Sequence, residues 1–456
     1  MSSALHVRLA ATGIGYAGLD GAWWLPASLP FELPAASRVE LQTIGRALFL
    51  LSDSVAALYG RDPAVTSLLE YKVAPQLRRF HNDAPVLGFR PDFQLVPQAG
   101  GLGFCATEVE IAPSAQGFAH AMQCAYGLES DLVAAMARLL HGRTLLIVGA
   151  EQWSEFLIEQ VAFCRALEEQ GAQARVLYDL PFAQIAESAR LGERWRPPLF
   201  GVEQRPPGWN PDLRARLEAS GLLPFLWPQD EEWPETPANV LVFRFGYLET
   251  FGEEHRDQLA LWQTRGVPFL NPLHFAHESK AVMAAFWLPA VQRWIGERDA
   301  TALDVLYRAL PHTLLLLPSL VPAVRAQRET MVVKWAGFDG GNEAWGGRSL
   351  HVGATYTDAE WATLLERLVT LPFPVVAQRL TPSQRITMRY QAADGTESTL
   401  DAGASRLRCF FVRDAQNIHA CGAHVTLSNA AVRVSEGTES VQAPVRFVAG
   451  QARTLA

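Results

Sequence analysis

The spacing of apolar residues predicts both helices and strands in the first third of the chain. Apolar positions recur at helical spacing over residues 39–59 and 117–140. Residues 86–111 instead have the pattern of short strands on either side of a turn at 98–101. The glycines of that turn allow the two strands to fold back on each other as a hairpin.

A strand–helix–strand pattern follows. Residues 144–149 form an apolar run typical of a buried strand, residues 151–171 have apolar side chains at helical spacing, and residues 174–178 form a second strand-like run. This order predicts a βαβ unit and therefore a parallel sheet. No G-x-G-x-x-G motif accompanies the unit, so dinucleotide binding is not indicated.

The remaining chain is predicted to contain loops, a strand, a helix and a strand-rich end. Residues 197–237 are proline-rich and read as connections, and residues 240–245 read as a strand. A helix is expected over residues 278–295, kinked or split at Pro289.

From residue 332 onward the pattern is mostly strand-like, with one helix. Thr357 and Glu360 form a capping box at the start of that helix. Its apolar stripe consists of Trp361, Leu364, Leu365, Leu368 and Val369. The whole pattern predicts an α/β protein that also contains α+β elements.

Composition narrows the class of protein. The 456 residues are 49% hydrophobic and 19% charged, which suits a folded protein with a sizeable core and excludes a disordered chain. A net charge of −8 argues against a general nucleic-acid binder. The longest apolar block, residues 314–317, is far shorter than the roughly 20 residues that a bilayer requires, so no membrane span is expected. Five cysteines without a C-x-x-C pair predict free thiols in the cytoplasm.

The basic residues are distributed unevenly between lysine and arginine. Only Lys72, Lys280 and Lys334 are lysines among 39 basic residues. A preference for arginine codons accounts for most of this imbalance. Lysine is nevertheless a compact point charge, whereas arginine is a wide planar fork, so each lysine is a candidate for a site that arginine does not fit.

A glycine-rich segment follows one of these lysines. Residues 337–347 contain five glycines between a predicted strand at 331–335, which carries Lys334, and another at 349–353. Glycines let backbone N–H groups approach a phosphate closely, and a neighbouring lysine adds a positive charge. The segment is no Walker A loop, because Gly347 and Arg348 replace the Lys-Ser/Thr pair. The alternative is a hairpin loop without a ligand.

An acidic hairpin is the second candidate for chemistry. Arg90 and Asp92 are two residues apart on one predicted strand, and Glu108 and Glu110 are two apart on the next, so each pair shares a face. Carboxylates that face each other repel unless a cation neutralises them, and Mg²⁺ with nucleotide phosphates would suit this set. The alternative is a set of solvated charges on an exposed strand face.

Together these motifs resemble the circularly permuted ATP-grasp ligases, the family of glutathionylspermidine synthetase. The shared order is R-x-D-F at 90–93, E-x-E at 108–110, Ser279-Lys280, then Lys334 and the glycine-rich segment. The resemblance implies an ATP-grasp fold in permuted order with a Rossmann-like βαβ scaffold. It also implies three parts: residues 1–142 with the acidic hairpin, the scaffold at 143–270, and the lid and nucleotide region at 271–456.

The resemblance also implies roles for the hairpin. Arg90 would steady the transferring phosphoryl group and an acyl-phosphate intermediate. Asp92, Glu108 and Glu110 would hold Mg²⁺. The family has Asn at the position of Glu110, and both residues offer an oxygen ligand.

For the nucleotide, the resemblance implies contacts from the later part of the chain. Lys280 and Lys334 would contact the ATP phosphates, and Gly340 and Gly341 would lie over them. The segment 374–379, which contains Gln378, would hold the adenine.

The reaction implied is an ATP- and Mg²⁺-dependent ligation of a carboxylate, small-molecule or peptide, to an amine through an acyl phosphate. No nucleophilic Ser or Cys is needed for such chemistry. Two alternatives remain open: a nucleotide-binding interaction module without ligase activity, and an ATP-dependent phosphotransferase.

Other charged residues carry weaker signals. Arg406 and Arg408 share a strand face, which indicates either contact with an anionic substrate or phosphate or charges on an exposed edge strand. His274 and His277 are three apart, and a structural role is expected rather than a metal site. Lys72 has no assigned role.

Overall fold

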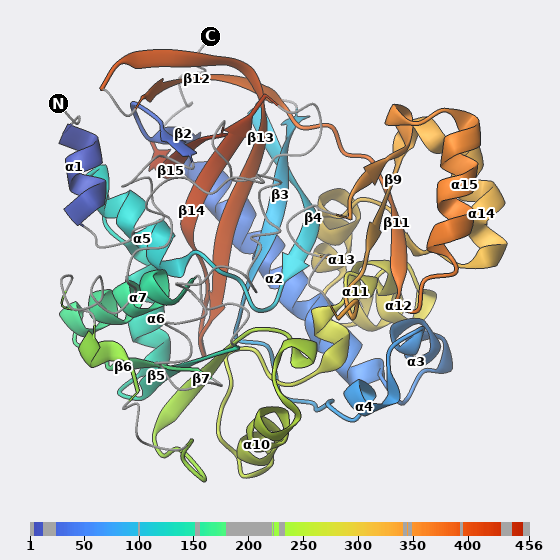
Figure 1. Ribbon diagram of the computed structural model, residues 1–456, viewed down its shortest axis with the longest axis horizontal. Coiled ribbons are helices and arrows are strands. Elements are labelled where there is room, and N and C mark those ends of the chain that lie inside the picture. Colours follow the sequence, from blue (N-terminus) through green and yellow to red (C-terminus); the bar gives the residue numbers. More distant parts are fainter. Residues whose placement is uncertain are drawn as a thin grey trace, which may run out of the picture.

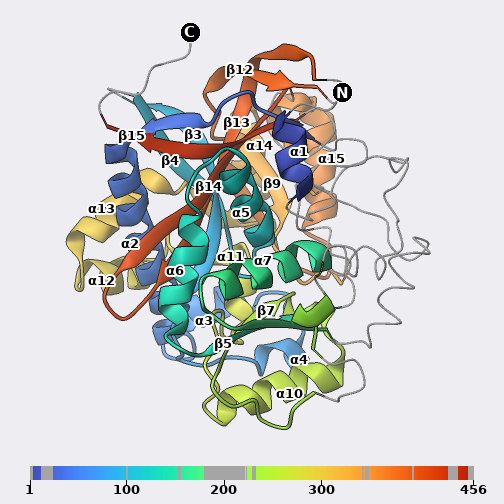
Figure 2. The ribbon, with the colours of Figure 1, turned by 90° about the vertical axis from the view of Figure 1, so that its left-hand side faces the viewer.

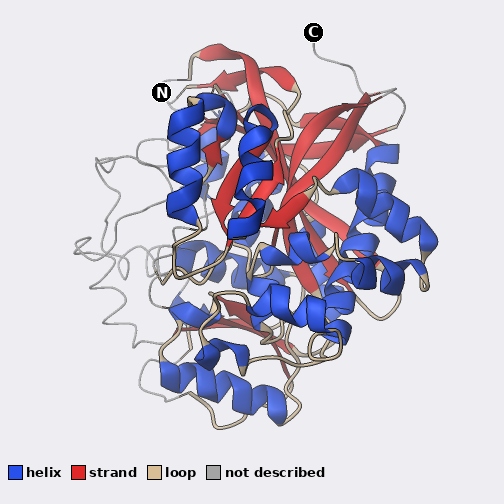
Figure 3. Cartoon of the chain, turned by 90° about the vertical axis from the view of Figure 1, so that its right-hand side faces the viewer, coloured by secondary structure: helices blue, strands red, loops and turns tan. Residues whose placement is uncertain are grey.

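Three β-sheets organise the residues that the structure describes (Figure 1). The structure is a computed structural model, and it describes residues 4–11, 24–98, 101–150, 156–178, 221, 223–227, 233–340, 344, 349–392, 395–429 and 440–449. Helices and sheets alternate and cover one another, so the predicted mixed α/β class is confirmed (Figure 3).

The largest sheet joins strands from both ends of the chain. Its order is β1-β15-β14-β13-β3-β4, with β12 paired to β13 and β2 paired to β15. The strands are β1 (Trp24–Pro26), β2 (Phe31–Pro34), β3 (Gly88–Gln98), β4 (Gly101–Glu110), β12 (Arg385–Gln391), β13 (Glu397–Arg413), β14 (Ile418–Ser428) and β15 (Ser440–Val448). The predicted hairpin is β3–β4, and β3 pairs with β13 in antiparallel fashion. The predicted division at residues 142 and 270 stays a prediction.

Helices cover both faces of this sheet. Figures 1 and 2 show α2 (Ala35–Leu58) on one face and α5 (Gln116–Ala125) with α6 (Asp131–Leu140) on the other. At Gly45 of α2 an added Cβ would come within 2.3 Å of the Phe411 ring, so only glycine permits this close approach to the sheet. The helical pattern predicted for 117–140 is thus two helices, separated by a turn in which Gly127 has a positive φ of 72°.

Among the described residues one helix, α2, is long and apolar enough to cross a membrane by length and composition. Its most apolar window is 56% buried inside the protein, which is typical of a core helix. It contacts β14 and α13 (Ala300–Ala309).

The smallest sheet contains the predicted βαβ unit. Its order is β6-β5-β7, all parallel, and its strands are β5 (Thr144–Gly149), β6 (Ala174–Tyr178) and β7 (Val240–Phe245). Helix α7 (Leu157–Glu169) connects β5 to β6, and residues 151–155 of the predicted helix lie outside the described residues. Most of the proline-rich stretch 197–237 also lies outside them.

A four-stranded antiparallel sheet has its own hydrophobic core. Its order is β10-β9-β11-β8, formed by β8 (Thr313–Leu315), β9 (Met331–Trp335), β10 (His351–Val352) and β11 (Val375–Arg379). Helices α14 (Val321–Ala326) and α15 (Asp358–Leu368) pack beside it. The capping box of Thr357 and Glu360 is present, and the predicted stripe buries Trp361 and three leucines in this core.

The remaining helices connect these layers. They are α1 (Ala4–Ala11), α3 (Pro63–Glu70), α4 (Pro75–Arg78), α10 (Glu253–Thr264), α11 (Ala281–Ala285) and α12 (Pro289–Gly296). The predicted split at Pro289 is confirmed, because α11 ends at Ala285 and Pro289 begins α12. Short 3₁₀ turns lie at η3 (Leu248–Thr250), η4 (Phe275–Glu278) and η6 (Arg328–Thr330).

Candidate active site

The β3–β4 hairpin places its charged side chains opposite one another. Arg90 pairs in register with Glu110, and Asp92 pairs with Glu108. Arg90 and Asp92 are only 5% and 6% exposed. The alternative of solvated charges on an exposed face is therefore wrong for these two residues.

A β-bulge in β4 creates a binding position for one lysine. The register steps from Asp92↔Glu108 to Phe93↔Ala106, so no residue of β3 pairs with Thr107 in register, although the Thr107 hydroxyl donates to the Asp92 carbonyl at 3.3 Å. The Thr107 carbonyl accepts a hydrogen bond of 2.7 Å from Lys334 Nζ, although 227 residues separate the two. Lys334 is held on β9, where it pairs with Val376 of β11.

The second lysine reaches the same strand from a different element. Lys280 precedes α11, and its Nζ lies 2.9 Å from Glu108 Oε1 and donates to the Ala344 carbonyl at 2.5 Å. The Lys280 backbone N–H donates to the carbonyl of Ala336, the residue that follows β9. Both lysines therefore converge on residues 107–108 of β4.

Asp92 is surrounded by three arginines. Its carboxylate oxygens lie 3.5 Å from Arg90 Nε, 3.1 Å from Arg406 Nη1 and 3.3 Å from Arg408 Nε. Burial alone would raise the pKa of Asp92, but the three guanidinium groups overcome that effect and hold the pKa below its ordinary value.

Arg406 and Arg408 lie on β13, which is an interior strand of the large sheet. The edge-strand interpretation of these two arginines is therefore wrong.

Five cationic side chains and three carboxylates lie together around β3 and β4. The cations are Arg90, Arg406, Arg408, Lys280 and Lys334, and the carboxylates are Asp92, Glu108 and Glu110. We call this set the charged cluster. Its excess of positive charge suits a polyanionic ligand.

The pKa of Glu110 is shifted in the opposite direction to that of Asp92. It accepts a 2.5 Å hydrogen bond from Arg90 Nη2 and a 2.9 Å bond from the Tyr247 hydroxyl. Burial nevertheless raises the pKa of Glu110 because Arg90 compensates for it only partly. Burial, with Glu110 nearby, also raises the pKa of Tyr247.

A buried ion pair fixes the segment that carries Lys280. Arg244 of β7 and Glu278 of η4 are 0% and 1% exposed at their side chains, and Arg244 Nη2 lies 2.6 Å from Glu278 Oε1. Glu278 also accepts a 2.7 Å hydrogen bond from the Leu248 N–H. Burial raises the pKa of Glu278 to about 7. The parallel sheet thus positions the turn that precedes Lys280.

The described part of the glycine-rich segment contacts the same region. The N–H groups of Phe338 and Gly340 donate to the carboxylate of Glu249, in the turn after β7. Gly341, the second glycine predicted to cover the phosphates, lies outside the described residues.

Gln378 is placed inside the four-stranded sheet. It is 2% exposed, and its amide nitrogen donates to Thr313 Oγ1 at 2.9 Å. Its backbone pairs with Thr313 on β8 and Val332 on β9. The side chain therefore serves packing between strands, and the predicted adenine contact of segment 374–379 stays a prediction.

No group of three or more His, Cys, Asp or Glu side chains in the described parts of the chain is arranged to hold a metal ion. His274 and His277 are buried with ring centroids 4.7 Å apart, and burial lowers the pKa of both. The expected structural role of this pair agrees with that environment. All five cysteines are free, and Cys124 alone is exposed.

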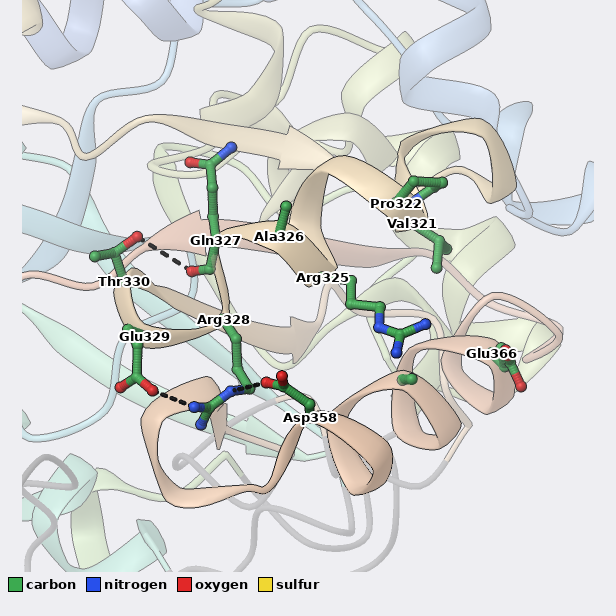
Figure 4. A pocket seen from close by; sticks show the side chains of 11 residues that line it. Val321, Pro322, Arg325, Ala326, Gln327, Arg328, Glu329, Thr330, Asp358 and Glu366 are labelled. Atoms are coloured by element: carbon green, nitrogen blue, oxygen red, sulfur yellow. Dashed lines mark hydrogen bonds and ion pairs between the residues drawn. The ribbon is translucent and has the colours of Figure 1, made fainter.

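A separate groove of about 750 Å³ lies between α14, η6 and α15 (Figure 4). Arg328 bridges this region through ion pairs to Glu329 and, at 2.7 Å, to Asp358. No residue of the charged cluster lines the groove.

Several residues of the candidate site had no signal in the sequence. Tyr247, Glu249 and the Arg244–Glu278 pair belong to no motif, and their contacts join segments that lie 27 to 137 residues apart. Two hints were available: Arg244 lies in the strand predicted at 240–245, and Glu278 directly precedes the Ser279-Lys280 motif.

Comparison with known proteins identifies the type of fold. No protein-family profile matches the sequence, and no curated protein matches it. Among solved structures, the chain is similar to a glutathione synthetase-like effector from Globodera pallida in its apo form, with a TM-score of 0.52, 11% identity and 97% coverage of both chains. A putative γ-glutamylcysteine synthetase from Methylobacillus flagellatus has a TM-score of 0.38 and 12% identity, over 85% of this chain and 84% of that one. The first similarity shows a mixed α/β fold of the glutathione synthetase-like kind, in agreement with the ATP-grasp-like prediction.

Proposed function

We propose that this protein is an ATP- and Mg²⁺-dependent carboxylate–amine ligase of the circularly permuted ATP-grasp type. One observation carries the proposal: Lys280 and Lys334, from two different elements, converge on the bulged acidic strand β4. The similarity of the whole fold to a glutathione synthetase-like protein also supports a ligase function.

The two lysines are proposed to bind the nucleotide phosphates. Lys280 faces Glu108, and Lys334 lies in a buried position where burial lowers its pKa to about 8. A buried ammonium group next to an excess of positive charge is costly, and a polyanion offsets that cost. Gly340 and Gly341 would lie over the phosphates, and segment 374–379 would hold the adenine.

Two carboxylates fit Mg²⁺. Glu108 and Glu110 lie on one face of β4, their side chains are 19% and 17% exposed, and both offer hard oxygen ligands. Burial, with the nearby carboxylates of Asp92 and Glu108, raises the pKa of Glu110, and a bound cation would stabilise its charged form. Mg²⁺ is usually bound by one or two carboxylates together with oxygens of the substrate phosphates. The ion would neutralise part of the negative charge of those phosphates.

Asp92, the third predicted metal ligand, is bound by arginines in this structure. We propose that it orients Arg90, Arg406 and Arg408 as a group. Its assignment to the metal stays a prediction.

The three arginines would stabilise the phosphoryl group during the two chemical steps. The substrate carboxylate attacks the γ-phosphorus of ATP, the bond to the bridging oxygen breaks, and ADP leaves. The amine next attacks the acyl phosphate, a C–N bond forms, and phosphate and a proton are released. Arg90, with Arg406 and Arg408, would hold the phosphoryl oxygens through both steps, which is mainly electrostatic stabilisation.

The test is turnover with a matched pair of lysine variants. The protein is incubated with Mg²⁺ and ATP and a panel of carboxylates, with and without amines, and ADP and amide are measured. A ligase gives ADP and amide together, a phosphotransferase gives ADP without amide, and a binding module gives neither. Lys280→Met should abolish ADP formation, whereas Lys72→Met should leave it unchanged. Equal turnover in both variants would refute the site.

A further inference from the structure

An internal carboxylate occupies N–H groups of the glycine-rich segment. Glu249 accepts hydrogen bonds of 3.1 Å from Phe338 N and 3.0 Å from Gly340 N. Phe338 and Gly340 have φ values of 62° and 68°, in the left-handed region. Backbone in this conformation directs neighbouring N–H groups to one side, where they form a concave anion-binding site. Residues 337–340 form what we call the loop arm.

The loop arm is attached to the proposed phosphate lysines. Ala336, just before it, accepts a hydrogen bond from the Lys280 N–H, and Lys334 lies two residues further back on β9. An added Cβ at Gly337 would lie 3.0 Å from the Glu278 carbonyl, so the arm passes close against η4. The N–H groups that Glu249 binds are therefore adjacent to the site proposed for the phosphates.

We propose that Glu249 is a positioning residue that competes with a nucleotide phosphate for the N–H groups of the loop arm. This inference rests on the proposed function, because the competing ligand is the polyanion that Lys280 and Lys334 would hold. When Glu249 binds the arm, the Gly340 N–H is not available to a phosphate. Release of Glu249 makes it available.

The surroundings of Glu249 make this contact sensitive to pH. Burial raises the pKa of Glu249 to about 7, and the N–H groups of Gly340 and Phe338 oppose that rise. Asp339 on the arm and Glu278 on η4 add to the rise, and Glu278 is itself paired with Arg244 of β7. From α10, Arg256 binds the Leu248 carbonyl at 3.3 Å. Above pH 7 the carboxylate accepts both N–H groups, whereas below pH 7 the protonated acid loses one acceptor oxygen.

The substitution Glu249→Gln imitates the protonated acid at every pH. If Glu249 holds the arm in about nine of ten molecules, its release tightens the apparent nucleotide affinity about tenfold. We therefore expect the Kd of Glu249→Gln for a non-hydrolysable ATP analogue with Mg²⁺ to be about tenfold lower than that of the wild type at pH 8. At pH 6 the two values should converge. The wild-type/variant ratio cancels the titration of Lys334 and of the nucleotide, which both proteins share.

Two measurements separate this inference from the proposed function. Calorimetry gives the Kd values, and hydrogen exchange of the Phe338 and Gly340 amides without nucleotide reports the contact itself. The exposed Glu253→Gln, on the first turn of α10, is the charge-matched control and should change neither.

Each outcome is decisive. Faster exchange with tighter binding in Glu249→Gln at pH 8 supports competition. Faster exchange with weaker binding means that Glu249 anchors the arm for the nucleotide, which overturns the inference. Unchanged exchange overturns it as well. Failure of every protein, wild type included, to bind the analogue refutes the proposed function and with it this inference, whatever the exchange rates show about the contact.

Discussion

Replacement of Lys334 by methionine should separate stability from nucleotide binding. Methionine has a similar length and no charge, so the change removes the ammonium group and retains most of the packing. Lys334 is 8% exposed, and burial lowers its pKa from 10.5 to about 8.

The magnitude follows from this pKa. Lowering the pKa of Lys334 from 10.5 to about 8 corresponds to about 3 kcal/mol of unfolding free energy. The folded protein is less stable by this amount below pH 8, where the buried lysine stays charged. As pH rises from about 8 to 10.5 this penalty disappears, because the lysine becomes neutral first in the folded protein. Lys334→Met removes the penalty at pH 7 but leaves the Thr107 carbonyl without its donor, at a cost of about 1–3 kcal/mol. The variant should therefore be as stable as the wild type or up to about 2 kcal/mol more stable.

Nucleotide binding should change in the opposite direction. Loss of one phosphate-binding charge should weaken the Kd for an ATP analogue with Mg²⁺ by about 10- to 100-fold, or about 1.4–2.8 kcal/mol. Urea unfolding followed by tryptophan fluorescence gives the stability at pH 7, and calorimetry gives the Kd. A variant that is destabilised by several kcal/mol and still binds the analogue with wild-type affinity would show that Lys334 is a structural residue and not a phosphate ligand.

Three further variants, one of them a control, test the contacts of Asp92 and Lys72. Asp92→Asn should destabilise the fold by about 3–5 kcal/mol in urea unfolding, because three buried arginines lose their counter-charge, and it should abolish ADP formation. Because the pKa of Asp92 is held below its ordinary value of 3.8, its contribution is complete above that pH and is lost as pH falls further, so the wild type should lose more stability in acid than the variant. The exposed Asp83→Asn should stay within about 0.5 kcal/mol of the wild type, and an equal effect of both changes would contradict the burial argument. Lys72→Met should cost about 1–3 kcal/mol, because Lys72 Nζ donates to the Val369 and Leu371 carbonyls at the end of α15, and it should leave the nucleotide Kd unchanged.

Local patterns were sufficient to predict the local elements. The β3–β4 hairpin, the βαβ unit, the split at Pro289 and the capping box at Thr357 are all determined by residues close to one another in the chain. Hydrophobic periodicity and the residues that form turns and helix caps involve only neighbouring positions in the chain. They can therefore be recognised in the sequence without a structure.

The surroundings of the site depend on distant segments. Arg406 binds Asp92 across 314 residues, and no periodicity indicates that β13 lies next to β3. The bulge at Thr107 also escaped prediction, although it provides the carbonyl that Lys334 binds. Long-range strand pairing determines both features, and a single sequence contains no signal for it. The same limit applies to Lys72, whose role at the end of α15 depends on a contact between residues nearly 300 positions apart.

Lys280 and Lys334 are proposed to bind nucleotide phosphates above the acidic strand β4. The decisive experiment is a crystal structure with a non-hydrolysable ATP analogue and Mg²⁺. We expect phosphate oxygens in contact with both lysines, and Mg²⁺ bound by Glu108 and Glu110. A nucleotide bound elsewhere, such as in the groove between α14 and α15, with both lysines still bound to Glu108 and Thr107, would contradict it.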